Sequence, residues 1–110
     1  MTNTQYWYSA EVISNYDGDT ITLNIDMGCR IYTINSIRLY RINTPELSQP
    51  GGKEARDFLS ILLPPKSKVR IRTFKNKEDK YGRWLGEIYI EDICLNDRLV
   101  QLGYAVYKEY

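Results

Sequence analysis

The stretch AEVISNYDGDTITLNID, residues 10–26, decides the fold. Two segments rich in β-forming residues, 10–14 and 20–26, flank an Asp-Gly pair at residues 17–18. An Asp-Gly pair between alternating segments is a strong signal for a β-hairpin. The apolar residues of the second segment share one face, and they are Ile21, Leu23 and Ile25. The stretch therefore predicts two antiparallel strands with one face turned toward a core.

A third strand is predicted over residues 30–42, after a turn at Met27-Gly28. Its apolar residues change phase between Ile34 and Ile37. One extra residue in a strand of an antiparallel pair produces such a change. We therefore predict a β-bulge near Asn35–Ser36.

The rest of the chain predicts a helix, two strands and a second helix. The first helix is expected near Lys53–Leu63, stopped by Pro64-Pro65. Its inward face is formed by Ala55, Phe58, Leu59 and Leu62. Strands are expected at residues 69–74 and 84–90, and Asn96 is expected to cap a short helix that reaches Leu102. This order predicts an α+β, mainly β domain whose sheet curls into a small barrel.

Composition limits the range of functions. The chain has 110 residues and a formal net charge of +1, so it is expected to form one domain without a global attraction for nucleic acid. Any such attraction must come from a local cluster of basic residues, for which a solvated strand face is the alternative explanation. The basic residues in this segment are Lys66, Lys68, Arg70, Arg72, Lys75, Lys77, Lys80 and Arg83.

The cysteines and the N-terminus indicate the compartment. Cys29 and Cys94 lack CxxC spacing, so neither a zinc site nor a disulfide framework is indicated. Residues 1–5 contain no basic region followed by an apolar run, and no segment is long and apolar enough to cross a membrane. We expect a soluble cytoplasmic protein, with secretion of a processed form as the alternative.

Three short motifs contain the residues suited to chemistry: YDGDT at 16–20, RLYRINTPE at 38–46 and DKYGRW at 79–84. Their carboxylate, amide and carbonyl oxygens suit a hard cation such as Ca²⁺. Their arginines suit phosphate, because a guanidinium group offers planar, bidentate donors. Together these groups indicate phosphodiester cleavage. Each motif alone is better explained as a hairpin turn, a proline-containing loop or a surface arginine.

Asp19 illustrates how the motifs can combine. Strand alternation places it on the side of Ile21, toward the edge of the core. An unpaired carboxylate is costly there, and a metal ion or an arginine is the usual partner.

In this order, the three motifs resemble the staphylococcal nuclease (thermonuclease) family over residues 12–105. The resemblance implies a single nuclease-like domain over residues 1–110, with an OB-fold five-stranded barrel and two packed helices. It also implies a metal-dependent endonuclease that hydrolyses DNA and RNA with little sequence preference and leaves a 3′-phosphate.

The resemblance implies a metal site and a position for the attacking water. Asp19, the side chain of Asn43 and the carbonyl of Thr44 would bind Ca²⁺, with Mg²⁺ as the alternative. Glu46 would orient or deprotonate the water. The best-known family pattern has a second aspartate where this chain has Asn43. A neutral amide brings no charge, so we expect weaker metal binding.

The resemblance also implies the phosphate contacts. Arg38 and Arg83 match the two arginines that grip the phosphate, and Lys80 and Tyr81 match positions near the terminal phosphate of a bound nucleotide. The expected partners are DNA and RNA, without a membrane, for a monomeric protein. The alternative function is a noncatalytic module, like those of Tudor-nuclease proteins, that binds nucleic acid or a protein partner.

Overall fold

The computed structural model describes residues 5–78 and 83–108 of the chain, with Lys80 and Tyr81 therefore outside the described residues. Eight strands and two helices are formed within these ranges. In chain order they are β1 Gln5–Asp17, β2 Thr20–Asp26, β3 Tyr32–Leu39, β4 Ile42–Asn43, α1 Gly52–Leu62, β5 Lys68–Glu78, β6 Trp84–Ile90, β7 Ile93–Cys94, α2 Leu95–Gln101 and β8 Val106–Tyr107.

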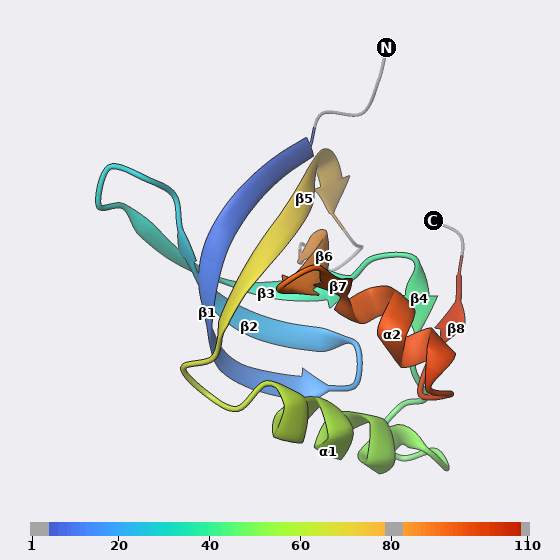
Figure 1. Cartoon of the computed structure of the whole chain (residues 1–110). Coiled ribbons are helices and arrows are strands. Elements are labelled where there is room, and N and C mark those ends of the chain that lie inside the picture. The colour runs from blue at the N-terminus through green and yellow to red at the C-terminus, as the bar shows by residue number, and fades with distance from the viewer. Residues whose placement is uncertain (1–4, 79–82, 109–110) are drawn as a thin grey trace.

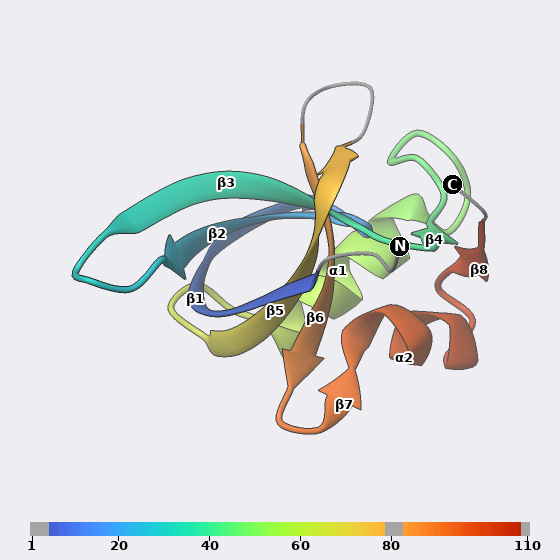
Figure 2. The same ribbon diagram turned by 90° about the horizontal axis from the view of Figure 1, so that it is seen from above.

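The main sheet has the strand order β3-β2-β1-β5-β6-β7, and an additional pairing joins β3 to β6 (Figures 1 and 2). Neighbouring strands in this order are antiparallel, whereas β3 and β6 pair in parallel, with Arg38 opposite Leu85. This pairing closes β1, β2, β3, β5 and β6 into a five-stranded barrel. The predicted OB-fold barrel with two packed helices is confirmed.

The barrel interior is filled by aliphatic side chains from alternating strand positions. Seven of them are fully buried: Ile21, Leu23, Ile25, Ile37, Leu39, Ile71 and Ile88. Helix α1 lies beneath β1 and β2 in Figure 1 and adds Ala55 and Leu59 to the core. Helix α2 adds Leu95 and Leu99. Burial of these faces provides most of the driving force for folding.

The predicted bulge near Asn35–Ser36 is wrong. The β2–β3 register runs without a shift from Thr20 opposite Arg38 to Asp26 opposite Tyr32. Ile37 is fully buried, whereas Ile34 is 64% exposed on the outer face. The apparent change of phase arose because Ile34 is an apolar residue that faces solvent. Irregularities in register lie elsewhere, in the β1–β2 pairing between Val12 and Ser14 and between Asn15 and Asp17, and in the β5–β6 pairing between Thr73 and Glu78.

The predicted cap at Asn96 is also wrong. Helix α2 begins at Leu95 after Cys94, and Asn96 is fully buried in its first turn. The Asn96 side chain accepts a hydrogen bond from the Ile88 amide at 3.2 Å and donates to the carbonyls of Tyr40 at 2.8 Å and Gly86 at 3.1 Å. These buried backbone groups need hydrogen-bond partners. By supplying them, the Asn96 side chain links the turn after β3 to β6.

A buried ion cluster fixes the chain between β3 and β4. The carboxylate of Glu87 is 1% exposed and pairs with both Arg41 and Arg72. The Arg41 Nε atom donates to Glu87 Oε2 at 3.0 Å, and the Arg41 backbone has a left-handed φ of 70°. The Lys108 amide also donates to the Arg41 carbonyl at 2.8 Å. These contacts set the direction in which the chain enters β4.

Candidate active site

Four segments converge at one end of the barrel: the β1–β2 turn, the end of β3, the segment from β4 to Glu46 and the start of β6. Antiparallel pairing sets Thr20 opposite Arg38, and parallel pairing sets Trp84 opposite Ile37. Because side chains alternate along a strand, Thr20, Arg38 and Arg83 point to the outer side of the barrel. Residues far apart in sequence therefore share one surface.

Asp19 and Arg38 form a buried ion pair at this end. Arg38 Nη2 lies 3.2 Å from Asp19 Oδ2, and each residue is 7% exposed. The same nitrogen donates to Asn43 Oδ1 at 3.1 Å, while Arg38 Nη1 donates to the Leu39 carbonyl at 2.8 Å. Of the two partners expected for a carboxylate at this position, Asp19 has the arginine.

Thr44 contacts the same oxygen of the Asp19 carboxylate as Arg38 does. Its backbone amide donates to Asp19 Oδ2 at 3.0 Å. Its hydroxyl is buried and has no hydrogen-bond partner among the described residues. A buried polar atom in this condition indicates a place where a ligand or water can bind.

Gly18 permits this close packing. A Cβ atom at Gly18 would lie 2.7 Å from the Ala55 Cβ atom and 2.9 Å from the Thr44 Oγ1 atom. Both distances are shorter than van der Waals contact, so any side chain would push the turn away from α1 and Thr44. The Asp-Gly-Asp sequence therefore needs glycine at its centre because the turn packs closely against Ala55 and Thr44, as well as because glycine favours the turn itself.

Arg83 reaches the site from β6. Its Nη1 atom donates to Thr20 Oγ1 at 2.9 Å, and this hydroxyl lies 3.5 Å from Asp19 Oδ1. The contact carries the Arg83 side chain across β3 to β2. The structure therefore brings Asp19, Arg38, Asn43, Thr44 and Arg83 together.

Glu46 lies beyond Pro45 in a compact loop and is exposed. The Glu46 carbonyl accepts a hydrogen bond from the Gln49 amide at 2.9 Å, and its own amide donates to Gln49 Oε1 at 3.3 Å. A Cβ atom at Gly52 would lie 1.9 Å from the Glu46 carbonyl oxygen, so the loop folds tightly onto the start of α1. The backbone of Glu46 is fixed, and its carboxylate faces solvent.

Asp17 is a neighbour of the site that the sequence did not single out. Its Oδ1 atom accepts a hydrogen bond from the Asp19 amide at 3.1 Å. Burial raises the pKa of the Asp17 carboxyl, and a side-chain hydrogen bond with Asp19 and the negative charge of Asp19 raise this pKa further, whereas the hydrogen bond from the Asp19 amide lowers it. The Asp-x-Asp spacing across a tight turn is the signal that could have identified this pair. A nearby cation would relieve the repulsion.

The oxygen atoms fit a hard divalent cation in type, though with little negative charge. Asp19 Oδ2 and Asn43 Oδ1 both approach one nitrogen of Arg38, so a single positive group already draws them together. Within residues 5–78 and 83–108, no group of three or more His, Cys, Asp or Glu side chains could hold a metal. A cation here would depend on Asp19, an amide and backbone oxygen, a set that suits Ca²⁺ better than a transition metal.

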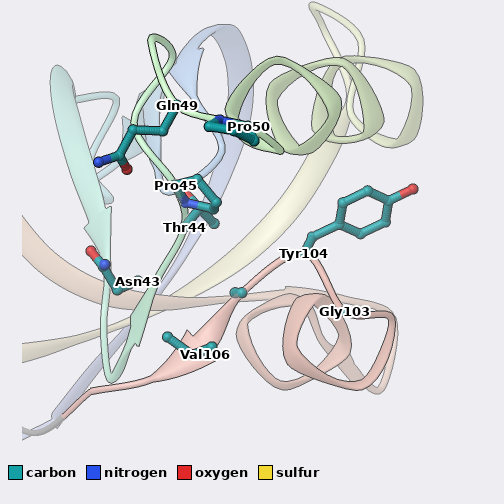
Figure 3. Close-up of a pocket in the computed structure, with 9 residues that line it drawn as sticks. Asn43, Thr44, Pro45, Gln49, Pro50, Gly103, Tyr104 and Val106 are labelled. Atoms are coloured by element: carbon teal, nitrogen blue, oxygen red, sulfur yellow. The ribbon is translucent and has the colours of Figure 1, made fainter.

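A pocket of about 400 Å³ adjoins the site (Figure 3). Its walls are the segment Asn43–Pro45, the pair Gln49-Pro50 and residues 103–106. Asn43 belongs to both the pocket wall and the Arg38 cluster, so the two share a boundary. The Tyr104 ring stacks on Phe58, with ring centroids 4.5 Å apart. The pocket is mainly apolar, as small-molecule subsites usually are.

No helix in the described part of the chain has the length and apolar character needed to cross a membrane.

Comparison with known proteins identifies relatives across most of the chain. The family model described as staphylococcal nuclease homologue matches residues 36–110. The thermonuclease of Staphylococcus hyicus is 35% identical over 103 residues, which cover 91% of this chain and 59% of that protein. An uncharacterized endonuclease of Escherichia coli O157:H7 is 36% identical over 101 residues, covering 90% of this chain and 61% of that protein.

A second uncharacterized endonuclease, from Haemophilus influenzae, is 31% identical over 103 residues that cover 93% of this chain and 54% of that protein. The chain thus spans between about half and three fifths of the length of these relatives. The matched family region includes Arg38, Asn43, Thr44, Glu46 and Arg83. With the barrel and the three motifs in agreement, the family match shows that this chain belongs to the staphylococcal nuclease family.

Proposed function

We propose that this chain is a metal-dependent nuclease that hydrolyses phosphodiester bonds of DNA and RNA with little sequence preference. The observation that carries the proposal is the convergence of two arginines on one buried carboxylate. Arg38 pairs with Asp19 directly, and Arg83 reaches the same carboxylate through the Thr20 hydroxyl.

The two arginines would bind the phosphate. Guanidinium groups match phosphate oxygens in geometry, and their attraction strengthens as negative charge grows on those oxygens in the transition state. Burial of Arg38 beside Asp19 strengthens its electrostatic interactions, since water screens them less. Contacts of this kind carry no information about the base sequence, which supports low sequence preference.

Asp19, Asn43 and the Thr44 carbonyl would hold Ca²⁺, with Mg²⁺ as the alternative. When bound, such an ion lowers the pKa of water and neutralises charge on a phosphate oxygen. Glu46 follows Thr44 by two residues, and its exposed side chain would orient or deprotonate the attacking water. The product expected from the family resemblance carries a 3′-phosphate.

A cleavage assay tests the proposal. Purified protein is incubated with single-stranded DNA and with RNA in Ca²⁺, in Mg²⁺ and in chelator, and the products are identified by mass spectrometry. We expect cleavage that requires metal and a loss of about 10²-fold or more in kcat when either Arg38 or Arg83 is replaced by lysine. The matched control is Arg98→Lys, at an exposed arginine of α2.

The second candidate function is a noncatalytic module that binds nucleic acid or a protein. The neutral Asn43 favours it, because the site then has few anionic ligands for a metal. Binding of oligonucleotide without cleavage in any metal would support this alternative and contradict the nuclease proposal.

A further inference from the structure

The β2–β3 hairpin exposes two large side chains on its outer face. Tyr32 is 61% exposed and Ile34 is 64% exposed, although both belong to a regular strand. The hairpin extends beyond the rest of the barrel in Figures 1 and 2. Exposure along this face falls from Tyr32 and Ile34 toward Arg38, which is 7% exposed. Neighbouring large residues on an open sheet face indicate an interaction surface.

This face continues directly into the candidate active site. The outward residues of β3 are Tyr32, Ile34, Ser36 and Arg38, in steps of two along an unbroken register. Six strand residues at about 3.3 Å each give a path of about 20 Å from Arg38 to Tyr32. Thr22 and Asn24 of β2 form the adjoining row, and the Thr22 and Ser36 hydroxyls lie 3.3 Å apart.

The charge of this face suits a polyanion. No outward residue from Thr20 to Asn24 or from Tyr32 to Arg38 is acidic. Glu11, which neighbours Asn24 on β1, is paired with Lys68 at 3.3 Å.

The two ends of the face differ in charge. Asp26 stands opposite Tyr32 at the far end, where it accepts a hydrogen bond from the Gly28 amide at 2.9 Å. Arg30 is exposed in the hairpin turn, and Arg83 adds its charge at the near end. A polyanion would therefore meet a path without acidic residues between Ile34 and Arg38, with the positive charges of Arg38 and Arg83 at the near end. At the far end the charge of Arg30 is offset by that of Asp26.

We infer that the face from Arg38 to Tyr32 binds the nucleic-acid strand that flanks the phosphate held by the two arginines, with bases stacked on Tyr32 and packed against Ile34. The inference rests on the proposed function, because it takes the phosphate at Arg38 as its starting point. Aromatic side chains bind bases of any sequence by stacking, and OB folds bind about 4–16 nucleotides in this way. Only unpaired bases can stack on the face, so it favours single strands.

Binding measurements in chelator test the inference without cleavage. Fluorescence anisotropy compares a labelled thymidine trinucleotide with a dodecanucleotide on the wild type, Tyr32→Ala and Ile34→Thr. Stacking is worth about 1–3 kcal/mol per base, so Tyr32→Ala should weaken dodecanucleotide binding by about 5–150-fold. Ile34→Thr should weaken it by a smaller factor, and trinucleotide binding should not change in either variant.

The matched control is Ile93→Thr, which removes an isoleucine of β7 that is 54% exposed. It should bind both oligonucleotides as the wild type does. Since Tyr32 and Ile34 are exposed, the variants should unfold at nearly the wild-type temperature, which circular dichroism checks. Unchanged dodecanucleotide affinity in both variants would overturn the inference.

Two further outcomes separate this inference from its competitors. If the cleavage assay fails but Tyr32→Ala still weakens dodecanucleotide binding, the nuclease proposal is wrong and the binding face stands. If sedimentation shows a wild-type dimer that Ile34→Thr converts to monomer with no change in oligonucleotide affinity, a second copy covers this face and the inference is overturned.

Discussion

Arg38 of β3 and Asp19 of the β1–β2 turn pair at a distance of 3.2 Å, with each side chain only about a tenth exposed. Water screens such a pair weakly, so removal of one partner leaves a buried charge without compensation. The same pair lies where the metal and the phosphate are proposed to meet. Its removal should therefore affect both stability and activity.

Asp19→Asn should abolish metal-dependent cleavage and lower the free energy of unfolding by about 3–5 kcal/mol, the usual cost of breaking a buried ion pair. Urea unfolding and the cleavage assay measure the two effects. The control is Asp57→Asn, because Asp57 pairs with Arg56 at 3.2 Å on the surface and is itself well exposed. That change should cost under about 1 kcal/mol. Full activity in Asp19→Asn would place the metal elsewhere.

Asn43→Asp should tighten Ca²⁺ binding, because it adds a second anionic ligand beside Asp19. Asn43 is exposed, so we expect about a tenfold gain, or about 1.4 kcal/mol, which is below the roughly 4 kcal/mol of two charges 4 Å apart at an effective dielectric of 20. Isothermal titration calorimetry measures the affinity. Gln101→Glu adds the same charge on α2 and should leave Ca²⁺ affinity unchanged. Equal affinities in Asn43→Asp and the wild type would exclude Asn43 as a ligand.

Gly18→Ala should destabilise the protein by about 1–3 kcal/mol through overpacking and should lower kcat, because the new methyl group would displace Thr44 or α1. Ala55→Gly in the same chain removes the nearest clashing atom and should restore part of the activity. Gly28→Ala is the control, since no atom lies within 4 Å of its added Cβ and only its positive φ opposes the change. A fully active Gly18→Ala protein would show that the turn tolerates displacement.

Asp17→Asn should raise stability at neutral pH in the absence of metal. The folded pKa of Asp17 is raised above its ordinary value of 3.8 by burial and by Asp19, so folding disfavours the ionised form. Stability should then fall as pH rises from 3.8 through the folded pKa, and this slope should be smaller in the variant. Urea unfolding across that pH range in chelator gives the comparison. A stability profile with the same slope in both proteins would contradict the assignment.

Local signals in the sequence located most elements because each signal acts within a few residues. The Asp-Gly pair predicted the β1–β2 hairpin, which the structure contains. The helical spacing of apolar residues before Pro64 predicted α1, which ends at Leu62. Ile34 was misread because alternation alone cannot tell an apolar residue that faces solvent from one shifted by a bulge. Asn96 was misread because its partners lie in β6 and in the turn after β3, far away in sequence.

The candidate site likewise has features that local motifs predict and features that depend on contacts between distant segments. Asp19, Asn43 and Thr44 could be proposed from motifs. In the structure Arg38 contacts Asp19 and Asn43, and the Thr44 amide contacts Asp19. The approach of Arg83 to Thr20 depends on the β3–β6 pairing, which no short pattern specifies. The raised pKa of Asp17 depends on burial, which a sequence does not give directly. The resemblance of the three motifs to a known family, and not any local pattern, predicted that Asp19, Arg38 and Arg83 belong to one site.

The parallel pairing of β3 with β6 has a consequence for the order of folding. These strands are separated by nearly half the chain, so bringing them together costs much more loop entropy than forming the β1–β2 or β2–β3 hairpins. We expect the hairpins to form early and the β3–β6 contact to form near the end. Arg83 reaches Thr20, the residue opposite Arg38, beside that contact, so a chain released from synthesis with its last strands unformed would lack the proposed phosphate-binding surface.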